Sequence, residues 1–327
     1  MTFKVAVIGL GNIGMGFDYD CPDASRILTH ASAFHYHPGF ELVAGVDPSS
    51  VARLRFTNKY GKPSFGSVSE LWDAFSPDLV ALCVPTPLHF SVFQEIVARR
   101  PKAIICEKPL TVAFHEAVKM VDSAKAAGVS LAVNYIRRFE PGVLELKRRI
   151  ATGEFGIFYK GVQWYTKGIL TNGSHFIDLL SFLFGPVTRV QLLSPGRSLL
   201  DFDCEPDARI SFADVEVYFI AARQECFSMH ELQLISNKGE VYYLAGGEVI
   251  MYRRTRPHPL VPGCTILEET GERIESDLGH YQWHVAQSLY EMLRTGNTLC
   301  STGATALRTM ETVQQLMEEA ATRVAHV

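Results

Sequence analysis

The feature that most constrains the fold of this 327-residue chain is a glycine pattern directly after its first apolar run. Residues 5–8 form a short β-branched run, and residues 9–14 that follow match GxGxxG. In a strand–turn–helix unit the first glycine permits a tight turn, the second lets the backbone approach a pyrophosphate, and the third allows close helix packing. The pattern therefore predicts a dinucleotide site. Its residues are Gly9, Gly11, Asn12, Ile13 and Gly14.

A second apolar run, residues 42–46, ends at Asp47. An acidic residue at this place binds the ribose hydroxyls of adenosine and repels a 2′-phosphate, so Asp47 favours NAD and leaves NADP as the second choice. The acid usually follows the glycines by about 20 residues, but Asp47 lies 33 positions after Gly14. The excess predicts an insertion over residues 15–28, before the main body of the first helix. The alternative interpretation of Asp47 is a turn acid before Pro48.

Apolar runs at residues 79–84, 103–106 and 129–133 continue the series and alternate with segments of helical periodicity. This alternation predicts a doubly wound parallel sheet with right-handed crossovers. We therefore expect an α/β chain whose dinucleotide-binding domain covers residues 1–134.

The alternation of apolar runs with helical segments ends after Asn134. Two helices are expected near residues 141–150 and 175–184, and most later strands follow one another directly, which predicts an antiparallel sheet. A second, α+β domain is thus expected over residues 135–327, closed by two amphipathic helices that can pack back on the first domain. Residues 253–279, rich in Pro, Gly and charge, are expected to form a surface loop.

Composition excludes several classes of function. The 31 Lys and Arg against 35 Asp and Glu give a net charge of −4. The chain therefore has no positive field strong enough to bind nucleic acid nonspecifically. No run approaches the roughly 18–20 apolar residues of a membrane span, and the first apolar stretch is too short for a secretory signal. The seven cysteines contain no CxxC pair, which favours a reducing cytoplasm. His30, His35 and His37 lack acids or cysteines at ligand spacing, so no metal site is predicted.

Two short segments stand at the carboxyl ends of the third and fourth long apolar runs, where ligands of open α/β sheets bind. One carries Pro85, Thr86 and His89, and the other carries Glu107 and Lys108. Beside an oxidised nicotinamide, the Lys108 ammonium can hold a reacting oxygen through a charge-assisted hydrogen bond. The alternative is a plain surface turn at the Lys-Pro pair.

The order and spacing of six motifs resembles that of the Gfo/Idh/MocA oxidoreductase family over nearly the whole chain. The motifs are GLGNIG at 9–14, VDP at 46–48, PTPLHF at 85–90, EKP at 107–109, NYIRRF at 134–139 and GSHFID at 173–178. The resemblance implies an N-terminal Rossmann domain and a C-terminal open sheet often used for oligomerisation, here into a dimer or tetramer. It also implies oxidation or reduction of a hydroxyl or carbonyl carbon in a sugar, cyclitol or sugar nucleotide.

The resemblance assigns the catalytic roles to Lys108 and His175, with His175 exchanging the hydroxyl proton and Lys108 stabilising the oxygen. Which of the two is the base stays open. Many members carry an acid four positions before this histidine, where this chain has Thr171, followed by Asn172. These two are expected to hydrogen-bond the substrate or cap the helix.

The same resemblance makes Arg138 a cofactor contact and Tyr135 a candidate for the wall near the nicotinamide or substrate. Asp178 is a further candidate for a substrate hydroxyl. Ordinary surface pairing or solvation is the alternative for these side chains. For the whole chain, the leading hypothesis is an NAD(P)-dependent dehydrogenase or reductase, and the alternative is a non-catalytic sensor that binds NAD and a sugar.

Overall fold

The computed structural model describes residues 1–200 and 202–325. This part of the chain forms two compact units. The first unit comprises Met1–Phe139 and Gly279–Leu307, and the second comprises Glu140–Leu278 and the chain from Arg308 onward. Both units are therefore discontinuous in sequence. Within the described residues, every helix is too short or too polar to pass through a bilayer.

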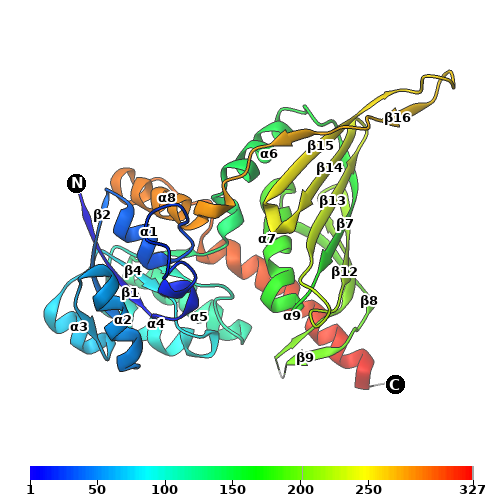
Figure 1. The fold of residues 1–327 in the computed structure, drawn as a ribbon. Helices are drawn as coiled ribbons and strands as arrows, with labels where there is room; N and C mark the ends of the chain where they lie inside the picture. The colour runs from blue at the N-terminus through cyan, green and yellow to red at the C-terminus, as the bar shows by residue number, and fades with distance from the viewer. Residues whose placement is uncertain (201, 326–327) are drawn as a thin grey trace. The chain divides into compact units, whose positions relative to one another are not determined.

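The first unit is built on a six-stranded parallel sheet with the strand order β3-β2-β1-β4-β5-β6 (Figure 1). This order confirms the predicted doubly wound sheet. The strands are β1 (Phe3–Ile8), β2 (Phe40–Val46), β3 (Ser64–Phe65), β4 (Leu79–Leu82), β5 (Ala103–Cys106) and β6 (Ser130–Val133). Strand β3 escaped prediction because its two residues are too few to carry a pattern.

Helices pack around this sheet and bury both of its faces. Consecutive residues Val5, Ala6 and Val7 of β1 are all fully buried, which explains why the strands are continuous apolar runs without alternation. The helices of the unit are α1 (His30–Tyr36), α2 (Ser50–Tyr60), α3 (Val68–Ala74), α4 (His89–Val97), α5 (Phe114–Ala127) and α8 (Tyr281–Thr295). Helix α8 contributes Val285 and Leu289 to the core that β1 and β2 share with α1.

The chain between the glycine turn and α1 is an insertion anchored by one buried acid. A π-helical turn, η1 (Asn12–Gly16), follows the glycines, and α1 begins only at His30. The carboxylate of Asp18 accepts hydrogen bonds from the backbone amides of Leu28 (2.8 Å) and Thr29 (3.1 Å) and from the Thr29 hydroxyl (2.7 Å). Thr29 in turn caps α1. Residues 15–28 therefore lie before the first helix, where the late position of Asp47 predicts an insertion.

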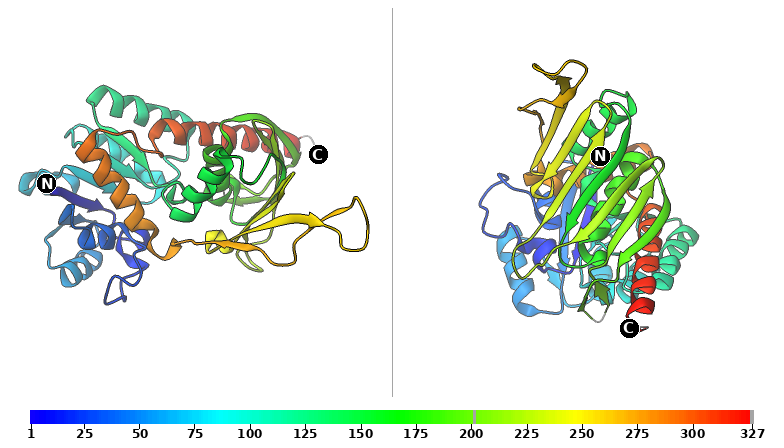
Figure 2. Two further views of the ribbon diagram at one scale, coloured as in Figure 1. Left: turned by 90° about the horizontal axis from the view of Figure 1, so that it is seen from above. Right: turned by 90° about the vertical axis from the view of Figure 1, so that its right-hand side faces the viewer.

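The second unit contains a nine-stranded sheet with the order β16-β15-β14-β13-β7-β12-β11-β8, and β17 pairs with β15 (Figures 1 and 2). The pairs are antiparallel except β7 with β12, which is parallel. The chain leaves β7 through a helix, returns at the β8 edge and builds back toward β7, so β12 arrives in the same direction. The predicted mainly antiparallel sheet is confirmed, with this one parallel pair added.

The strands of the large sheet are β7 (Phe158–Tyr165), β8 (Val187–Ser194), β11 (Asp207–Phe212), β12 (Val215–Ala221), β13 (His230–Ser236), β14 (Gly239–Leu244), β15 (Val249–Pro257), β16 (Thr265–Leu267) and β17 (Glu272–Ile274). Two short strands, β9 (Ser198–Leu200) and β10 (Asp203–Cys204), form a separate pair. The expectation of a loop over residues 253–279 was wrong in part, because β15 extends to Pro257 and both β16 and β17 lie inside that range. The strands pair through their backbones and carry charged side chains such as Arg254 and Glu272, so the apolar pattern that reveals a strand is weak there.

Three helices cover one face of the large sheet: α6 (Pro141–Ala151), α7 (Ser174–Phe184) and most of α9 (Gly303–Ala325). Phe176 and Leu180 of α7 and Leu316 of α9 pack against sheet residues in one apolar core. In the right-hand view of Figure 2 the strands of this sheet face the viewer. Trp164 of β7 remains 40% exposed although it lies in the middle of the sheet.

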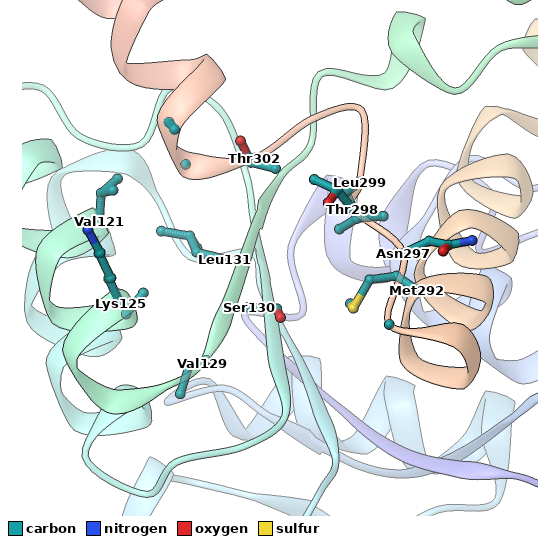
Figure 3. A pocket seen from close by; sticks show the side chains of 14 residues that line it. Val121, Lys125, Val129, Ser130, Leu131, Met292, Asn297, Thr298, Leu299 and Thr302 are labelled. Carbon is teal, nitrogen blue, oxygen red and sulfur yellow. The ribbon is translucent and has the colours of Figure 1, made fainter.

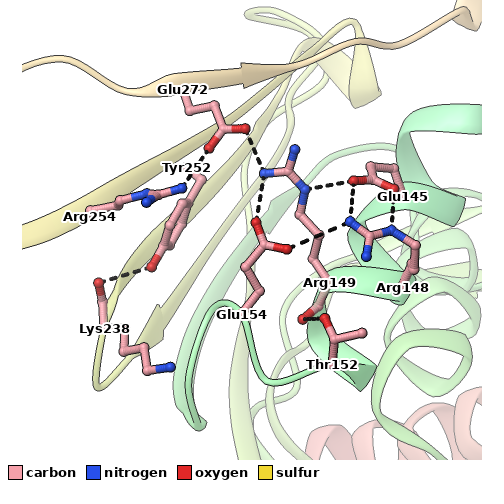
Figure 4. Close-up of polar contacts among 9 residues, drawn as sticks. All are labelled: Glu145, Arg148, Arg149, Thr152, Glu154, Lys238, Tyr252, Arg254 and Glu272. Atoms are coloured by element: carbon pink, nitrogen blue, oxygen red, sulfur yellow. Dashed lines mark hydrogen bonds and ion pairs between the residues drawn. The ribbon is translucent and has the colours of Figure 1, made fainter.

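An ion-pair network joins the end of α6 to β17 (Figure 4). The Arg149 guanidinium donates to Glu145 (2.7 Å) and Glu272 (2.7 Å) and lies 3.4 Å from Glu154. Hydrogen bonds from Arg148 and Arg149 lower the pKa of Glu145 to about 2. Arg149 is 15% exposed and its guanidinium also lies over the Phe155 ring, whereas Arg148 is 55% exposed.

We expect Arg149→Met to destabilise the second unit by about 1–2 kcal/mol, because three carboxylates then lose their shared cation. Arg148→Met is the matched control and is expected to change stability little, since an exposed pair contributes little. Urea unfolding of both variants measures the difference. Equal stabilities for the two variants would contradict this account of the network.

Candidate active site

A cavity of about 860 Å³ lies in the first unit at the carboxyl ends of β1, β2, β4 and β5. It brings together ten of the residues that the sequence analysis assigned to the cofactor. These are Gly9, Gly11, Asn12, Ile13, Asp47, Pro85, Thr86, His89, Glu107 and Lys108. Among the described residues, Gly14 and Arg138 are not part of its lining. Phe17, Gly66 and Ser67 line it and were missed, because nothing in their local sequence distinguishes them from ordinary loop residues.

The three glycines of the turn play three different structural parts. Gly9 has a φ of +95°, and a side chain there would meet the backbone of Cys83 at 2.5 Å. A Cβ on Gly14 would lie 2.0 Å from the carbonyl oxygen of Gly9, so this residue must be glycine for η1 to pack against the turn. A Cβ on Gly11 would meet no atom within 4 Å. Only the middle glycine therefore leaves open space, which is where a pyrophosphate would approach.

Asp47 is fixed at the end of β2 by backbone amides. One carboxylate oxygen accepts from Leu10 in the glycine turn (2.9 Å) and the other from Ser49 (2.8 Å). Arg53 donates to the carbonyl oxygens of Asp47 (2.8 Å) and Pro48 (2.9 Å) and so holds the same turn from behind. Each carboxylate oxygen keeps a further lone pair, so Asp47 can still accept hydrogen bonds from a ribose diol.

His89 connects the end of β4 to the turn that carries Lys108. It is buried, with Nε2 lying 2.8 Å from the carbonyl oxygen of Val84 and Nδ1 lying 3.0 Å from those of Pro109 and Leu110. Burial lowers the pKa of His89, although the backbone hydrogen bonds oppose that effect. His89 thus fixes the backbone of the two residues that follow Lys108. The peptide bond from Lys108 to Pro109 is cis.

Glu107, next to Lys108, is a hydrogen-bonded carboxylate. Its Oε1 lies 2.8 Å from His30 Nε2 and 2.6 Å from the Asn134 amide nitrogen, and its Oε2 accepts from the Lys108 backbone amide (3.3 Å). Burial alone would raise the pKa of Glu107, but the hydrogen bonds from His30 and Asn134 and the charge of Lys108 hold it below its usual range. The sequence alone gave no signal for the His30 contact, because 77 residues separate the partners.

The three histidines around α1 have separate partners. His30 contacts Glu107, whereas His37 Nε2 lies 2.9 Å from Gln287 on α8 and the His35 ring packs on Tyr60. Within the part of the chain that the structure describes, no three His, Cys, Asp or Glu side chains are arranged to hold a metal ion.

In the second unit, the predicted residues before α7 bind their own neighbours. The Thr171 hydroxyl donates to Asp203 (2.7 Å), and the Asn172 amide donates to the carbonyl oxygen of Thr166 (3.0 Å). Asp203 also accepts from the backbone amides of Leu170 and Thr171, and its burial raises its pKa. The Asp203 carboxylate therefore binds Thr171. This contact was not predicted, because Asp203 follows Thr171 by 32 residues.

His175 is the second residue of α7 and is partly buried. Asp178, one turn further, is buried and accepts a hydrogen bond from the Thr309 hydroxyl (3.3 Å). In the first unit, Tyr135 is 1% exposed, and Arg138 is buried with its guanidinium donating to the carbonyl oxygen of Cys300 (2.9 Å). The ligand roles of these four residues stay predictions.

A second cavity in the first unit has a volume of about 350 Å³ (Figure 3). It lies between α5, β6 and the connection from α8 to α9, with Val121, Leu131 and Leu299 among its lining residues. Lys125 is its one titratable side chain among the described residues, and none of the predicted site residues lines it. The larger cavity is therefore the candidate site.

A parallel sheet of this order, with a glycine turn whose amide-rich end faces a cavity and an acid at the tip of β2, defines a Rossmann-type dinucleotide-binding protein. Residues 3–135 match the model of an oxidoreductase family with an NAD-binding Rossmann fold, GFO_IDH_MocA. This match covers the first unit up to residue 135 and agrees with the resemblance to the Gfo/Idh/MocA family seen in the sequence.

Among the relatives is scyllo-inositol 2-dehydrogenase (NAD(+)) of Bacillus subtilis, 32% identical over 165 residues, or 48% of this chain and 43% of that protein. The matches cover 43–55% of the first three curated relatives, so the chain spans about half of their length.

Solved structures resemble the chain over nearly its whole length at low identity. The WlbA dehydrogenase of Bordetella pertussis, in complex with NADH and UDP-GlcNAcA, has a TM-score of 0.74 at 18% identity, covering 97% of this chain and 96% of that one. Levoglucosan dehydrogenase, in complex with NADH and levoglucosan, has a TM-score of 0.77 at 16% identity, with 98% of both chains covered. These likenesses establish the shared two-unit fold.

Proposed function

We propose that the chain is an NAD-dependent oxidoreductase that interconverts a hydroxyl and a carbonyl carbon of a sugar, cyclitol or sugar nucleotide. The observation that carries this proposal is the 860 Å³ cavity, in which the glycine turn, Asp47 and Lys108 line one space. The named relatives support the substrate class, since they include a dehydrogenase of a cyclitol and one solved with an anhydrosugar.

The lining residues fit a dinucleotide. The open space at Gly11 suits the pyrophosphate, and Asp47 suits the adenosine ribose, whose 2′-hydroxyl can donate to the carboxylate. A 2′-phosphate would meet the negative charge of Asp47, so we propose NAD as the preferred cofactor. When bound, the nicotinamide supplies a hydride acceptor or donor at its C4 atom.

Lys108 and His175 are the proposed catalytic residues. The ammonium of Lys108 donates a hydrogen bond to the substrate oxygen and so stabilises negative charge that develops there. His175 accepts the hydroxyl proton during oxidation and returns it during reduction, a role that suits histidine because the unperturbed imidazole titrates near neutral pH. Thr171, Asn172, Asp178 and Tyr135 are proposed as substrate contacts, and Arg138 as a further cofactor contact.

We further propose that the protein is a cytoplasmic homo-oligomer, a dimer or tetramer, that associates through the large sheet. Exposed aromatic side chains on β7, Tyr159 and Trp164, favour such an interface. The seven cysteines of the chain are all free thiols, which favours a reducing compartment.

The test combines binding and turnover. Fluorescence titration is expected to give at least about tenfold tighter binding of NAD than of NADP, which corresponds to about 1.4 kcal/mol. A panel of sugars, cyclitols and sugar nucleotides is then screened for NADH formation at 340 nm. Binding of NAD with no turnover on any member of the panel would contradict the enzymatic proposal and favour a sensor.

A further inference from the structure

We propose that His30 and Gln282 are positioning residues that keep Glu107 ionised beside Lys108 and thereby keep the Lys108 amine protonated. The inference rests on the proposed role of Lys108, but it concerns a network that lies entirely in the first unit. Gln282 comes from α8, His30 from α1, and Glu107 and Asn134 from the ends of β5 and β6.

The orientation of each amide in the network follows from Glu107. An ionised carboxylate can only accept hydrogen bonds, so the side-chain group of Asn134 that lies 2.6 Å from Oε1 must be its NH₂. The same NH₂ lies 3.2 Å from Gln282, which must therefore present its oxygen there. The NH₂ of Gln282 then points toward Nδ1 of His30 at 2.8 Å.

These orientations fix the proton on His30. Because the Gln282 NH₂ donates to Nδ1, that nitrogen must be unprotonated, and the single ring proton lies on Nε2. His30 Nε2 donates this proton to Glu107 Oε1 at 2.8 Å. The imidazole is thus neutral, so it stabilises the carboxylate through a hydrogen bond without cancelling its charge. With Glu107 ionised, each of these four contacts pairs a donor with an acceptor, while the buried side-chain oxygen of Asn134 has no hydrogen-bond partner among the residues that the structure describes.

Four further titratable groups interact electrostatically with Glu107, and burial shifts the pKa of each in the direction of its neutral form. Burial raises the pKa of the Cys83 and Cys106 thiols and of the Tyr281 hydroxyl, and burial lowers the pKa of His89. Glu107 lies beside Lys108: its Oε2 accepts from the Lys108 backbone amide at 3.3 Å, and the charge of Lys108 helps to lower the pKa of Glu107. A carboxylate near an amine raises the pKa of that amine. Lys108 is thus kept a hydrogen-bond donor and cannot serve as the base.

The first test measures the pKa of Lys108 directly, without cofactor or substrate. Lysines are reductively ¹³C-methylated, the Lys108 signal is assigned with Lys108→Arg, and its shift is followed against pH by NMR. In Glu107→Gln the pKa of Lys108 is expected to fall by about 1 or more. In Gln282→Leu it also falls, because His30 can then take a second proton or release Glu107, and either change reduces the negative charge.

Gln287→Leu is the matched control. Gln287 also lies on α8 and also contacts a histidine, His37, but that pair has no contact with Glu107. The pKa of Lys108 is expected to stay at the wild-type value in this variant. An unchanged pKa of Lys108 in either Glu107→Gln or Gln282→Leu would overturn the proposal.

A second measurement needs no variant in the network. In ¹⁵N NMR of the wild-type protein, His30 is expected to be a neutral imidazole with its proton on Nε2. A proton on Nδ1, or a doubly protonated ring at neutral pH, would overturn the proposal. Neither measurement involves turnover, so the network can fail while the dehydrogenase proposal stands. If the network is found and no substrate turns over, only the proposed function fails.

Discussion

Lys108→Met is expected to lower kcat/KM on the order of 10³-fold while the Kd for NAD changes by less than about threefold. Removing one preorganised donor to a developing oxyanion costs roughly 10²–10³-fold in rate, and the lost positive charge adds to this. Methionine keeps the length and apolar stem of the side chain, so the cavity wall is retained. Lys108 lines the same cavity, but the main cofactor contacts are expected at the glycine turn and Asp47, and the Lys108 ammonium is assigned to the substrate oxygen.

Steady-state turnover and fluorescence titration of NAD measure the two effects separately. The matched control is Lys102→Met, which removes a lysine 54% exposed at the opposite end of β5. That variant is expected to keep wild-type turnover. Turnover of Lys108→Met within tenfold of the wild type would mean that the Lys108 ammonium does not stabilise the reacting oxygen.

The second large effect is expected at two glycines only three residues apart. Gly11→Ala is expected to fold with wild-type stability and to raise the Kd for NAD on the order of 10²-fold, or about 3 kcal/mol. Its Cβ meets no protein atom within 4 Å and occupies the space proposed for the pyrophosphate. Gly14→Ala is expected to lose about 3 kcal/mol of stability, because its Cβ would lie 2.0 Å from the Gly9 carbonyl oxygen.

Each variant serves as the control of the other. Urea unfolding without cofactor is expected to separate them, and NAD titration of the folded variants completes the comparison. If Gly11→Ala bound NAD as tightly as the wild type, the pyrophosphate could not lie against this turn. If Gly14→Ala were as stable as the wild type, the packing of η1 against the turn would be looser than described.

The first unit could be predicted well from the sequence because its information is local. Continuous apolar runs such as residues 103–106 are typical of strands buried on both faces, and the glycine turn lies directly beside the first of them. The second unit was harder. Its β15 to β17 edge carries exposed charged pairs such as Arg254 with Glu272, so the hydrophobic pattern that reveals a strand is weak there.

In the candidate site, most predicted residues that belong to a motif of the first unit line the cavity, whereas their supporting partners were not predicted. Lys108 and Asp47 lie at strand ends, where chemistry is expected from position alone. Gln282 supports His30 from 252 residues away, and Asp203 lies behind Thr171 across 32 residues. Such contacts depend on which elements pack together. The tertiary fold decides that packing, and no spacing of residues within the sequence reveals it.

The discontinuity of the first unit also bears on how the protein is made. Its core includes Val285, Leu289 and Leu299, yet its sheet is complete by Val133. A ribosome adding about 5–20 residues per second needs roughly 8–30 s to produce the intervening residues. During that interval the nascent sheet lacks one of its covering helices, so its apolar surface is open to chaperones until α8 emerges.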